Sequence, residues 1–344
     1  MTMRICRRTL LATTVGVFAG TGAKAADMQL SGSGGGVVAP MLQGWKANEK
    51  FQALGLDVSF RVNGSPSGTS QILAGITDFA SVEIPLSDEQ LAASNLYQFP
   101  FAFTAVVFVV NIPGVESNRL QLTGQILGGI YAGQIAKWND PKIVAANPGL
   151  SLPDLDMHPI THAEPGGAML GDTIVVLSYL IAANPDWQAK FGNTLPKRWA
   201  FGSMSSNNDT IVETIKALPG SIAYLPLGVA AGAKLTIAMK RDSNGKAVQA
   251  DQASLRAAVG AVDWAKSSNL VGKLIDLPGD GVWPVAFVSY LVVSRNLARK
   301  PNGAALRAFT KFVVTDGSAA IIGKNSEPAP PQVRTRVVQQ LEKF

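Results

Sequence analysis

Apolar and polar residues follow two different periods along the chain, and these periods predict strands and helices in turn. Apolar residues recur at every second position over 58–62, as in a strand, and at helical spacing over 38–45. The nearly continuous apolar run over 105–111 is typical of a strand covered on both faces. This repeated strand, loop and helix order predicts an α/β protein with largely parallel sheets. Further strands are expected at 28–30, 221–224 and 287–293, and further helices from 72 and over 174–180, 304–314 and 333–341.

Glycine- and serine-rich loops precede three of the predicted helices, at 32–36, 64–69 and 166–171. The first amides of a helix have no partner within the helix, and the helix dipole is positive at that end, so such loops can bind anions. Each loop taken alone is more readily explained as a tight turn. Three such loops in one chain favour a ligand-binding protein.

The first 25 residues have the pattern of a secretory signal peptide. Three arginines precede an apolar run over 10–20, and Ala23 and Ala25 form a small-x-small cleavage pattern. We therefore expect export, to the periplasm in a Gram-negative cell. The adjacent Arg7 and Arg8 leave both the general secretory route and the twin-arginine route open.

Removal of this segment changes the charge of the protein. The whole chain of 344 residues has a formal charge of +6, and the segment holds four of the 30 basic residues and none of the 24 acidic ones. The remaining 319 residues therefore carry only +2. A charge this small gives no support for a nucleic-acid-binding protein. With 47% hydrophobic and 16% charged residues, the chain is far too apolar to be disordered and can form a large core.

The residues give little support for an enzyme or a metal site. The only cysteine is Cys6 in the signal segment, and the two histidines, His158 and His162, stand four residues apart with a proline between them. Neither a zinc motif nor a complete nucleotide-binding motif is present. The segment 64–68 resembles a nucleophile elbow, but Pro66 stands where the serine would be. We therefore expect no catalytic activity, no cofactor and no metal.

Several stretches carry a family resemblance over nearly the whole chain after the signal segment. The most specific are LYQFP at 96–100, VVNIPG at 109–114 and IYAGQIAKWND at 130–140, and further ones lie at 78–79, 85–89, 147–150, 218–224 and 283–284. With these stretches the chain resembles the periplasmic phosphate-binding proteins of phosphate ABC importers, the PstS-type family. The resemblance implies a two-lobed periplasmic-binding-protein fold of type II, in which each lobe is a mixed, mostly parallel sheet flanked by helices. It places residues 26–100 and 284–344 in the first lobe and 101–283 in the second.

The resemblance also implies a function. The protein would be an exported, non-enzymatic solute-binding protein that captures phosphate or a related oxyanion between its lobes for an ABC permease. We expect a monomer. The alternative is a diverged paralogue that no longer binds phosphate and that binds another solute or serves as a sensory or interaction protein.

The ligand contacts that the resemblance implies in the first lobe fall on four residues. The family's phosphate-binding threonine and the neighbouring phenylalanine match Gly36 and Val37, which lose the hydroxyl but keep their backbone amides. The second-loop serine matches Ser65. The family's aspartate, which accepts the proton of bound hydrogen phosphate, matches Glu83. Either the ligand brings a proton to Glu83, or Glu83 is itself protonated.

The second lobe departs most from the family, which has an arginine followed shortly by Ser-Gly-Thr. The arginine matches His162 or, without a gap, a glycine, and Gly166 and Gly167 are the other expected ligand contacts. A neutral imidazole does not offer the bidentate fork of an arginine. His162 could instead be a polar residue at a strand end with no ligand contact. Asp172 is expected to be the N-cap of the following helix, or else an acid near the ligand.

Overall fold

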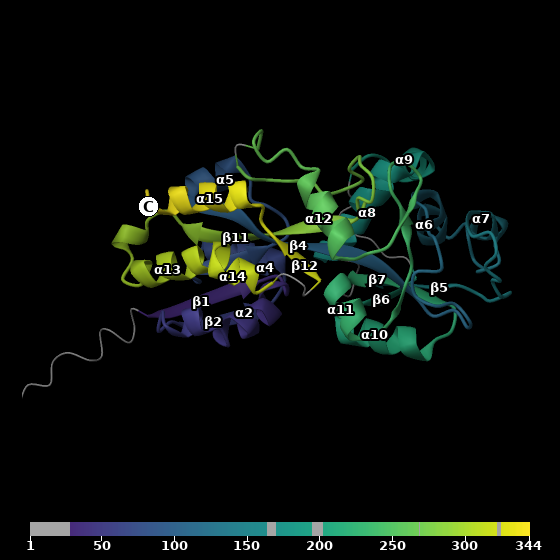
Figure 1. The fold of residues 1–344 in the computed structure, drawn as a ribbon, viewed down its shortest axis with the longest axis horizontal. Coiled ribbons are helices and arrows are strands. Elements are labelled where there is room, and N and C mark those ends of the chain that lie inside the picture. The colour runs from purple at the N-terminus through teal and green to yellow at the C-terminus, as the bar shows by residue number, and fades with distance from the viewer. Residues whose placement is uncertain (1–27, 164–169, 195–201, 268, 322–324) are drawn as a thin grey trace, which may run out of the picture.

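The computed structural model describes residues 28–163, 170–194, 202–267, 269–321 and 325–344. The expected signal segment over 1–25 lies outside these ranges, as do Gly166 and Gly167. In Figure 1 the chain forms two lobes side by side, each with strands inside and helices outside.

The first lobe is built from both ends of the described chain, so the C-terminal helices pack beside the N-terminal strands (Figure 1). Its elements are β1 (Gln29–Gly34), α2 (Val38–Lys46), α3 (Glu49–Gln52), β2 (Asp57–Val62), α4 (Ser65–Leu73), β3 (Phe79–Val82), α5 (Asp88–Ala93), a 3-10 turn at Leu297–Arg299, α13 (Gly303–Val314), α14 (Asp316–Ala319), β12 (Ser326–Pro328) and α15 (Pro331–Leu341).

The second lobe is built from the middle of the chain, which colours it teal and green in Figure 1. Its elements are α6 (Gly124–Tyr131), α7 (Pro141–Ala146), β5 (His158–His162), α8 (Gly171–Ala183), α9 (Pro185–Phe191), β6 (Ser203–Ser205), α10 (Asn208–Ala217), β7 (Ser221–Pro226), α11 (Leu227–Gly232), β8 (Thr236–Ile237), β9 (Lys240–Arg241) and β10 (Ala247–Val248). Helix α12 (Gln252–Gly260) follows and packs on β12 and on the long strand β4 (Leu96–Val110).

Strand β4 joins the two lobes. Residues 96–105 pair with β11 (Ala286–Ser294), whereas 106–110 pair with β7 of the second lobe. Every residue of β4 after Tyr97 is buried, as the apolar run predicted. The strand passes Pro100 without a break, opposite an irregularity in β11 that tolerates the missing N–H. The lobe boundaries expected after residue 100 and before residue 284 stay a prediction.

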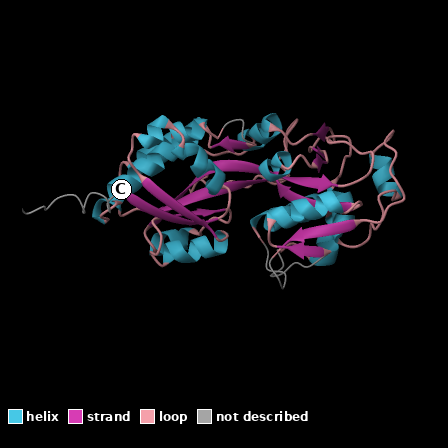
Figure 2. Cartoon of the chain, turned by 90° about the horizontal axis from the view of Figure 1, so that it is seen from below, coloured by secondary structure: helices cyan, strands magenta, loops and turns pink. Residues whose placement is uncertain are grey.

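Among the described strands, parallel pairing occurs in two groups of three, which lie at the two ends of the main sheet. Strands β2, β1 and β3 lie parallel in the first lobe, and β7, β5 and β6 lie parallel in the second. The joining strands β4 and β11, together with β12 and β8, add antiparallel pairs. The main sheet is therefore mixed in both lobes, and parallel pairing is less dominant than expected from the strand and helix order. Figure 2 shows the sheet continuing from one lobe to the other, with helices on both sides.

Most expected elements are present, and a capping box formed by Ser87 and Gln90 begins α5. Helix α4 differs, because it begins at Ser65 inside the expected loop and ends at Leu73, before Ile76. Its buried face is made of Ser65, Gly68 and Ile72, and a Cβ on Gly68 would lie 2.6 Å from Gly34 Cα. The small residues Ser65 and Gly68 resemble a loop in the sequence, but in the structure they allow the helix to lie close to β1.

Aromatic side chains fill the core of the first lobe. Trp45 of α2 is buried edge-on against Phe101 of β4 and against Phe309 and Phe312 of α13. These contacts fix α2 and α13 on the sheet and hold the loop before α2 in place. In the ranges that the structure describes, no helix has both the length and the apolar character to cross a membrane.

Candidate functional site

The loop between β1 and α2 passes very close to Glu83, the first residue after β3. Gly34 has φ +133°, which favours glycine, and the next residue, Gly35, donates its N–H to Ser81 O at 2.8 Å. A Cβ on Gly35 would overlap the carboxyl oxygens of Glu83. A side chain at position 35 would therefore displace the Glu83 carboxyl group, because the backbone lies directly against it.

Helix α4 brings a hydroxyl group to the same carboxyl group. Ser65 is its first residue, is buried, and donates a hydrogen bond from Oγ to Glu83 Oε2. Its Oγ also accepts a hydrogen bond from the backbone N–H of Glu83 at 3.0 Å. Gly64, with φ +82°, turns the chain into the helix, and Pro66 follows at a position where a helix needs no N–H donor.

The second lobe reaches Glu83 through the start of α8. A Cβ on Gly171 would lie 3.5 Å from both Cβ and Oε2 of Glu83. Asp172 is close enough for its charge to raise the pKa of Glu83. The five residues Gly35, Ser65, Glu83, Gly171 and Asp172 thus meet where the lobes touch, and they are called the junction site below.

Backbone amides are available beside the junction site. Gly36 and Val37 follow Gly35 at the entrance to α2, and within the described residues their N–H groups have no acceptor. Helices α4 and α8 also have open amides in their first turns, as every helix does. The positive ends of α4 and α8, together with the loop that enters α2, thus come together around one carboxyl group, an arrangement suited to binding a negatively charged group.

The carboxyl group of Glu83 is in an unusual environment. The residue as a whole is only half-buried, but Oε1 is enclosed and receives no hydrogen bond from the described residues. The pKa of Glu83 is raised to about 8, mainly by burial and to a smaller extent by the nearby Asp172, while a hydrogen bond from its own backbone opposes the rise. The burial of the carboxyl oxygens determines this pKa, because the charge lies on them. The average exposure of the whole residue matters less.

Hydrogen bonds between buried side chains stabilise the part of the junction site that the second lobe contributes. His162 Nδ1 lies 2.6 Å from Asp172 Oδ2, and both residues are buried. The Tyr224 hydroxyl donates to Thr173 Oγ1 at 2.7 Å and accepts a hydrogen bond from the His162 N–H at 3.2 Å. Thr173 Oγ1 also donates to the His162 carbonyl. This network ties the end of β5 to the start of α8.

The expected N-cap role of Asp172 is wrong. Leu170 occupies the N-cap position of α8, and Asp172 lies two residues further on. Asp172 still accepts a hydrogen bond from a first-turn amide, that of Thr173, at 2.9 Å. Its main partner is His162, because a buried carboxylate gains more from an imidazole ring at 2.6 Å than from the helix end alone.

The structure brings Ser65 and Glu83 into contact and places Gly36 and Val37 next to Gly35. His162 lies at the end of β5, with its Nδ1 2.6 Å from Asp172 Oδ2. Ligand contact by any of these residues stays a prediction. Sequence reasoning did not identify the other participants, which are Gly35, Gly171, Thr173 and Tyr224; of these, only the glycines gave a signal, as members of the glycine-rich loops.

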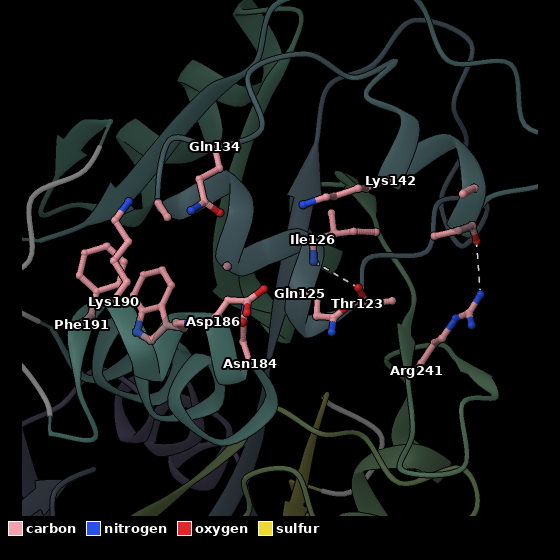
Figure 3. A pocket seen from close by; sticks show the side chains of 15 residues that line it. Thr123, Gln125, Ile126, Gln134, Lys142, Asn184, Asp186, Lys190, Phe191 and Arg241 are labelled. Carbon is pink, nitrogen blue, oxygen red and sulfur yellow. Dashed lines mark hydrogen bonds between the residues drawn. The ribbon is translucent and has the colours of Figure 1, made fainter.

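A hollow of about 410 Å³ lies in the second lobe, between α6, α7 and α9 (Figure 3). Lys142, Lys190 and Arg241 line it together with Asp186. Arg241 bonds to neighbouring protein oxygens at 3.2 and 3.4 Å, and Lys190 lies over the Phe191 ring. None of the residues that the sequence predicts for the ligand site lines this hollow. Its size alone therefore does not make it the functional site.

Comparison with known proteins bears on both the fold and the family. A family model for the PBP superfamily domain matches residues 19–317. The phosphate-binding protein PstS of Xylella fastidiosa strain Temecula1 is 31% identical over 320 residues, which cover 92% of this chain and 85% of that protein.

Solved structures of similar fold include the phosphate-binding protein from Stenotrophomonas maltophilia, with a TM-score of 0.65 and 17% identity over 90% of this chain and 93% of that one. A phosphate ABC transporter substrate-binding protein from Clostridium perfringens, solved with bound phosphate, has a TM-score of 0.60 and 13% identity over 88% of this chain and 100% of that one. These likenesses confirm the two-lobed α/β architecture expected from the sequence. From the family model and the identity to PstS over nearly its full length, the chain belongs to the PBP superfamily and, within it, to the PstS-type phosphate-binding proteins.

Proposed function

We propose that this protein captures phosphate, or a closely related oxyanion, between its two lobes and delivers it to an ABC permease. The observation that carries the proposal is the junction site, where a glycine loop and two helix starts from different lobes surround one buried position. A ligand held there would contact both lobes at once and would stabilise their closed arrangement. The relatives, which are named phosphate-binding proteins, support the choice of ligand.

In this proposal the first lobe binds the anion through the amides of Gly36 and Val37, the Ser65 hydroxyl and the Glu83 carboxyl group. The second lobe adds the start of α8 at Gly171. His162, whose Nδ1 lies against Asp172, remains a predicted contact. Gly166 and Gly167, which lie outside the described residues, remain further predicted contacts.

We also propose that the protein is exported to the periplasm, acts as a monomer and has no catalytic activity. The basic and apolar pattern over 1–25 supports export, and the naming of the relatives as binding proteins supports a role in transport. The alternative of a diverged paralogue without phosphate binding is not favoured, because relatives over most of the chain carry the name of phosphate-binding proteins.

The experiment is an isothermal titration of phosphate into protein that has been stripped of ligand by partial unfolding and refolding. We expect saturable binding near neutral pH. Ser65→Ala is expected to weaken binding by roughly 10-fold or more, because a hydroxyl donor to a charged group contributes about 1.5–3 kcal/mol. Ser70→Ala is the matched control, since Ser70 lies on the same helix but is exposed and bonds only to Pro66 O. Heat no different from buffer dilution would overturn the proposal.

A further inference from the structure

The two carboxyl oxygens of Glu83 have different surroundings. Oε2 accepts a hydrogen bond from Ser65 Oγ, whereas Oε1 is buried and has no donor within the described residues. An ionised buried carboxylate is usually satisfied by several N–H or O–H donors, because it has about four acceptor positions and no proton. The geometry around Oε1 therefore suits an O–H group that can itself donate to a ligand.

The charged groups around Glu83 also disfavour its ionised form. The loop at Gly35 and the start of α4 at Ser65 bring no charged side chain to the carboxyl group. Helix α8 brings a second carboxyl group, that of Asp172, which lies 2.6 Å from His162 Nδ1. Within the described residues no lysine or arginine contacts Glu83. Burial and Asp172 both raise the pKa of Glu83, in agreement with this geometry.

The helix starts oppose this effect, because their positive ends favour an anion. None of their amides donates to Oε1, however. A bound oxyanion would take up that favourable potential itself, and an ionised Glu83 would then be a second negative charge beside it, with Asp172 as a third. Repulsion between neighbouring negative charges is relieved when one of the groups binds a proton.

We propose that Glu83 is protonated when the oxyanion is bound and donates its O–H to a ligand oxygen. This inference rests on the proposed function and deepens it. The site then recognises an acceptor oxygen instead of a ligand proton, so it also accepts dianions that bring no proton, of which sulfate is the simplest. Above the pH at which free Glu83 ionises, the proton comes from the solvent, and binding takes up one proton per ligand.

Sulfate is the sharpest probe because it has no proton of its own to exchange in the neutral range. We would titrate ligand-stripped protein with sulfate and with phosphate from pH 6 to 9. The proposal expects sulfate to bind within about 100-fold of phosphate at pH 7. It also expects the sulfate affinity to fall by about tenfold per pH unit above roughly pH 8, the slope for uptake of one proton.

Glu83→Gln replaces the proposed O–H by an amide N–H of similar shape, which donates at every pH. This variant is expected to bind both anions with a loss of less than about tenfold and without the pH slope. Glu89→Gln is the matched control, because Glu89 is exposed in the first turn of α5 and should behave as the unmodified protein does.

The outcomes separate the inference from the proposed function. Phosphate binding with rejection of sulfate by more than about 1,000-fold, together with loss of phosphate binding in Glu83→Gln, would overturn the inference and leave the function standing. Such rejection is what a site built around an ionised acceptor produces, because sulfate has no proton to offer. Sulfate binding without phosphate binding would support the donor role of Glu83 and overturn phosphate as the ligand. Binding of neither anion would overturn both.

Discussion

The junction site has two sides, called here the first-lobe wall and the second-lobe wall, and different kinds of contact hold them in place. The first-lobe wall relies on close approach of backbone segments, with Gly34 against Ser81 and Gly68 against Gly34. The second-lobe wall relies on buried side-chain bonds among His162, Asp172, Thr173 and Tyr224. A backbone wall tolerates changes of side chain but not the addition of a Cβ, whereas a side-chain wall fails when one partner is removed. The following changes test this difference, from the largest expected effect to the smallest.

Asp172→Ala should be the most damaging change to the second-lobe wall. It leaves the buried His162 without its carboxylate partner, and removal of one member of a buried pair costs about 3 kcal/mol. We expect this loss in the free energy of unfolding measured by urea denaturation. Asp186→Ala is the matched control, because Asp186 holds the same position in α9 but is exposed. An equal loss in the two variants would show that the pair with His162 does not stabilise the wall.

Gly68→Ala should be the most damaging change to the first-lobe wall. The new Cβ would lie 2.6 Å from Gly34 Cα, so α4 or β1 must move, at a cost of about 2 kcal/mol. Phosphate binding should weaken at the same time, because Gly34 leads directly into the binding loop. Gly260→Ala, in the last turn of α12 with open space around it, should be neutral or slightly stabilising. Unchanged stability and affinity in Gly68→Ala would argue against a wall built by backbone contact.

The pH dependence of stability should reveal the burial of Glu83 without any ligand. Its pKa is about 8 in the folded protein and about 4.5 in the unfolded chain, so its contribution is fully present below pH 4.5 and is lost as the pH rises through 8. Relative to Glu83→Gln, the unmodified protein should therefore lose stability over this range, by at most about 1.4 kcal/mol per pH unit and by less because the residue is half exposed. Urea denaturation of both proteins at pH 5, 7 and 9 measures it. Parallel curves would show that Glu83 ionises normally.

Tyr224→Phe should have the smallest effect, about 1 kcal/mol of unfolding free energy. It removes the hydroxyl that bonds to His162 N and Thr173 Oγ1 while keeping the ring. Tyr131→Phe is a matched control, because the Tyr131 hydroxyl is equally buried, has no partner in the described part of the chain, and lies on a ring 5.7 Å from that of Tyr224. Thermal or urea unfolding should show a loss for Tyr224 alone. A larger loss for Tyr131 would contradict the network.

Much of the fold could be predicted because its signals are local. The period-2 pattern at 58–62, the buried run at 105–111 and the helical spacing at 38–45 all correspond to observed elements. The start of α4 could not be predicted from hydrophobicity, because its buried face consists of Ser65 and Gly68, which pack only against another backbone. The antiparallel pairing of β4 with β11 could not be predicted either, since the partners lie far apart in the sequence.

The site could be predicted only in its first-lobe part. Ser65 and Glu83 stand at positions that the family resemblance marks, and the structure brings them together. Asp172 was assigned to a cap because a short acidic residue before an apolar helix is the usual capping signal. Its pairing with His162 depends on how the end of β5 meets the start of α8, a tertiary contact that no local pattern encodes. Tyr224 joins the same network from a third segment, 62 residues beyond His162.

The central claim is that phosphate binds at the junction site, and the most direct measurement is a crystal structure of the protein grown with phosphate. The account predicts one phosphate between the lobes, with its oxygens against the amides of Gly36 and Val37, Ser65 Oγ and the Glu83 carboxyl group, and with the start of α8 on its other side. Phosphate seated only in the hollow beside Lys142 and Lys190, with the junction site unchanged, would contradict it.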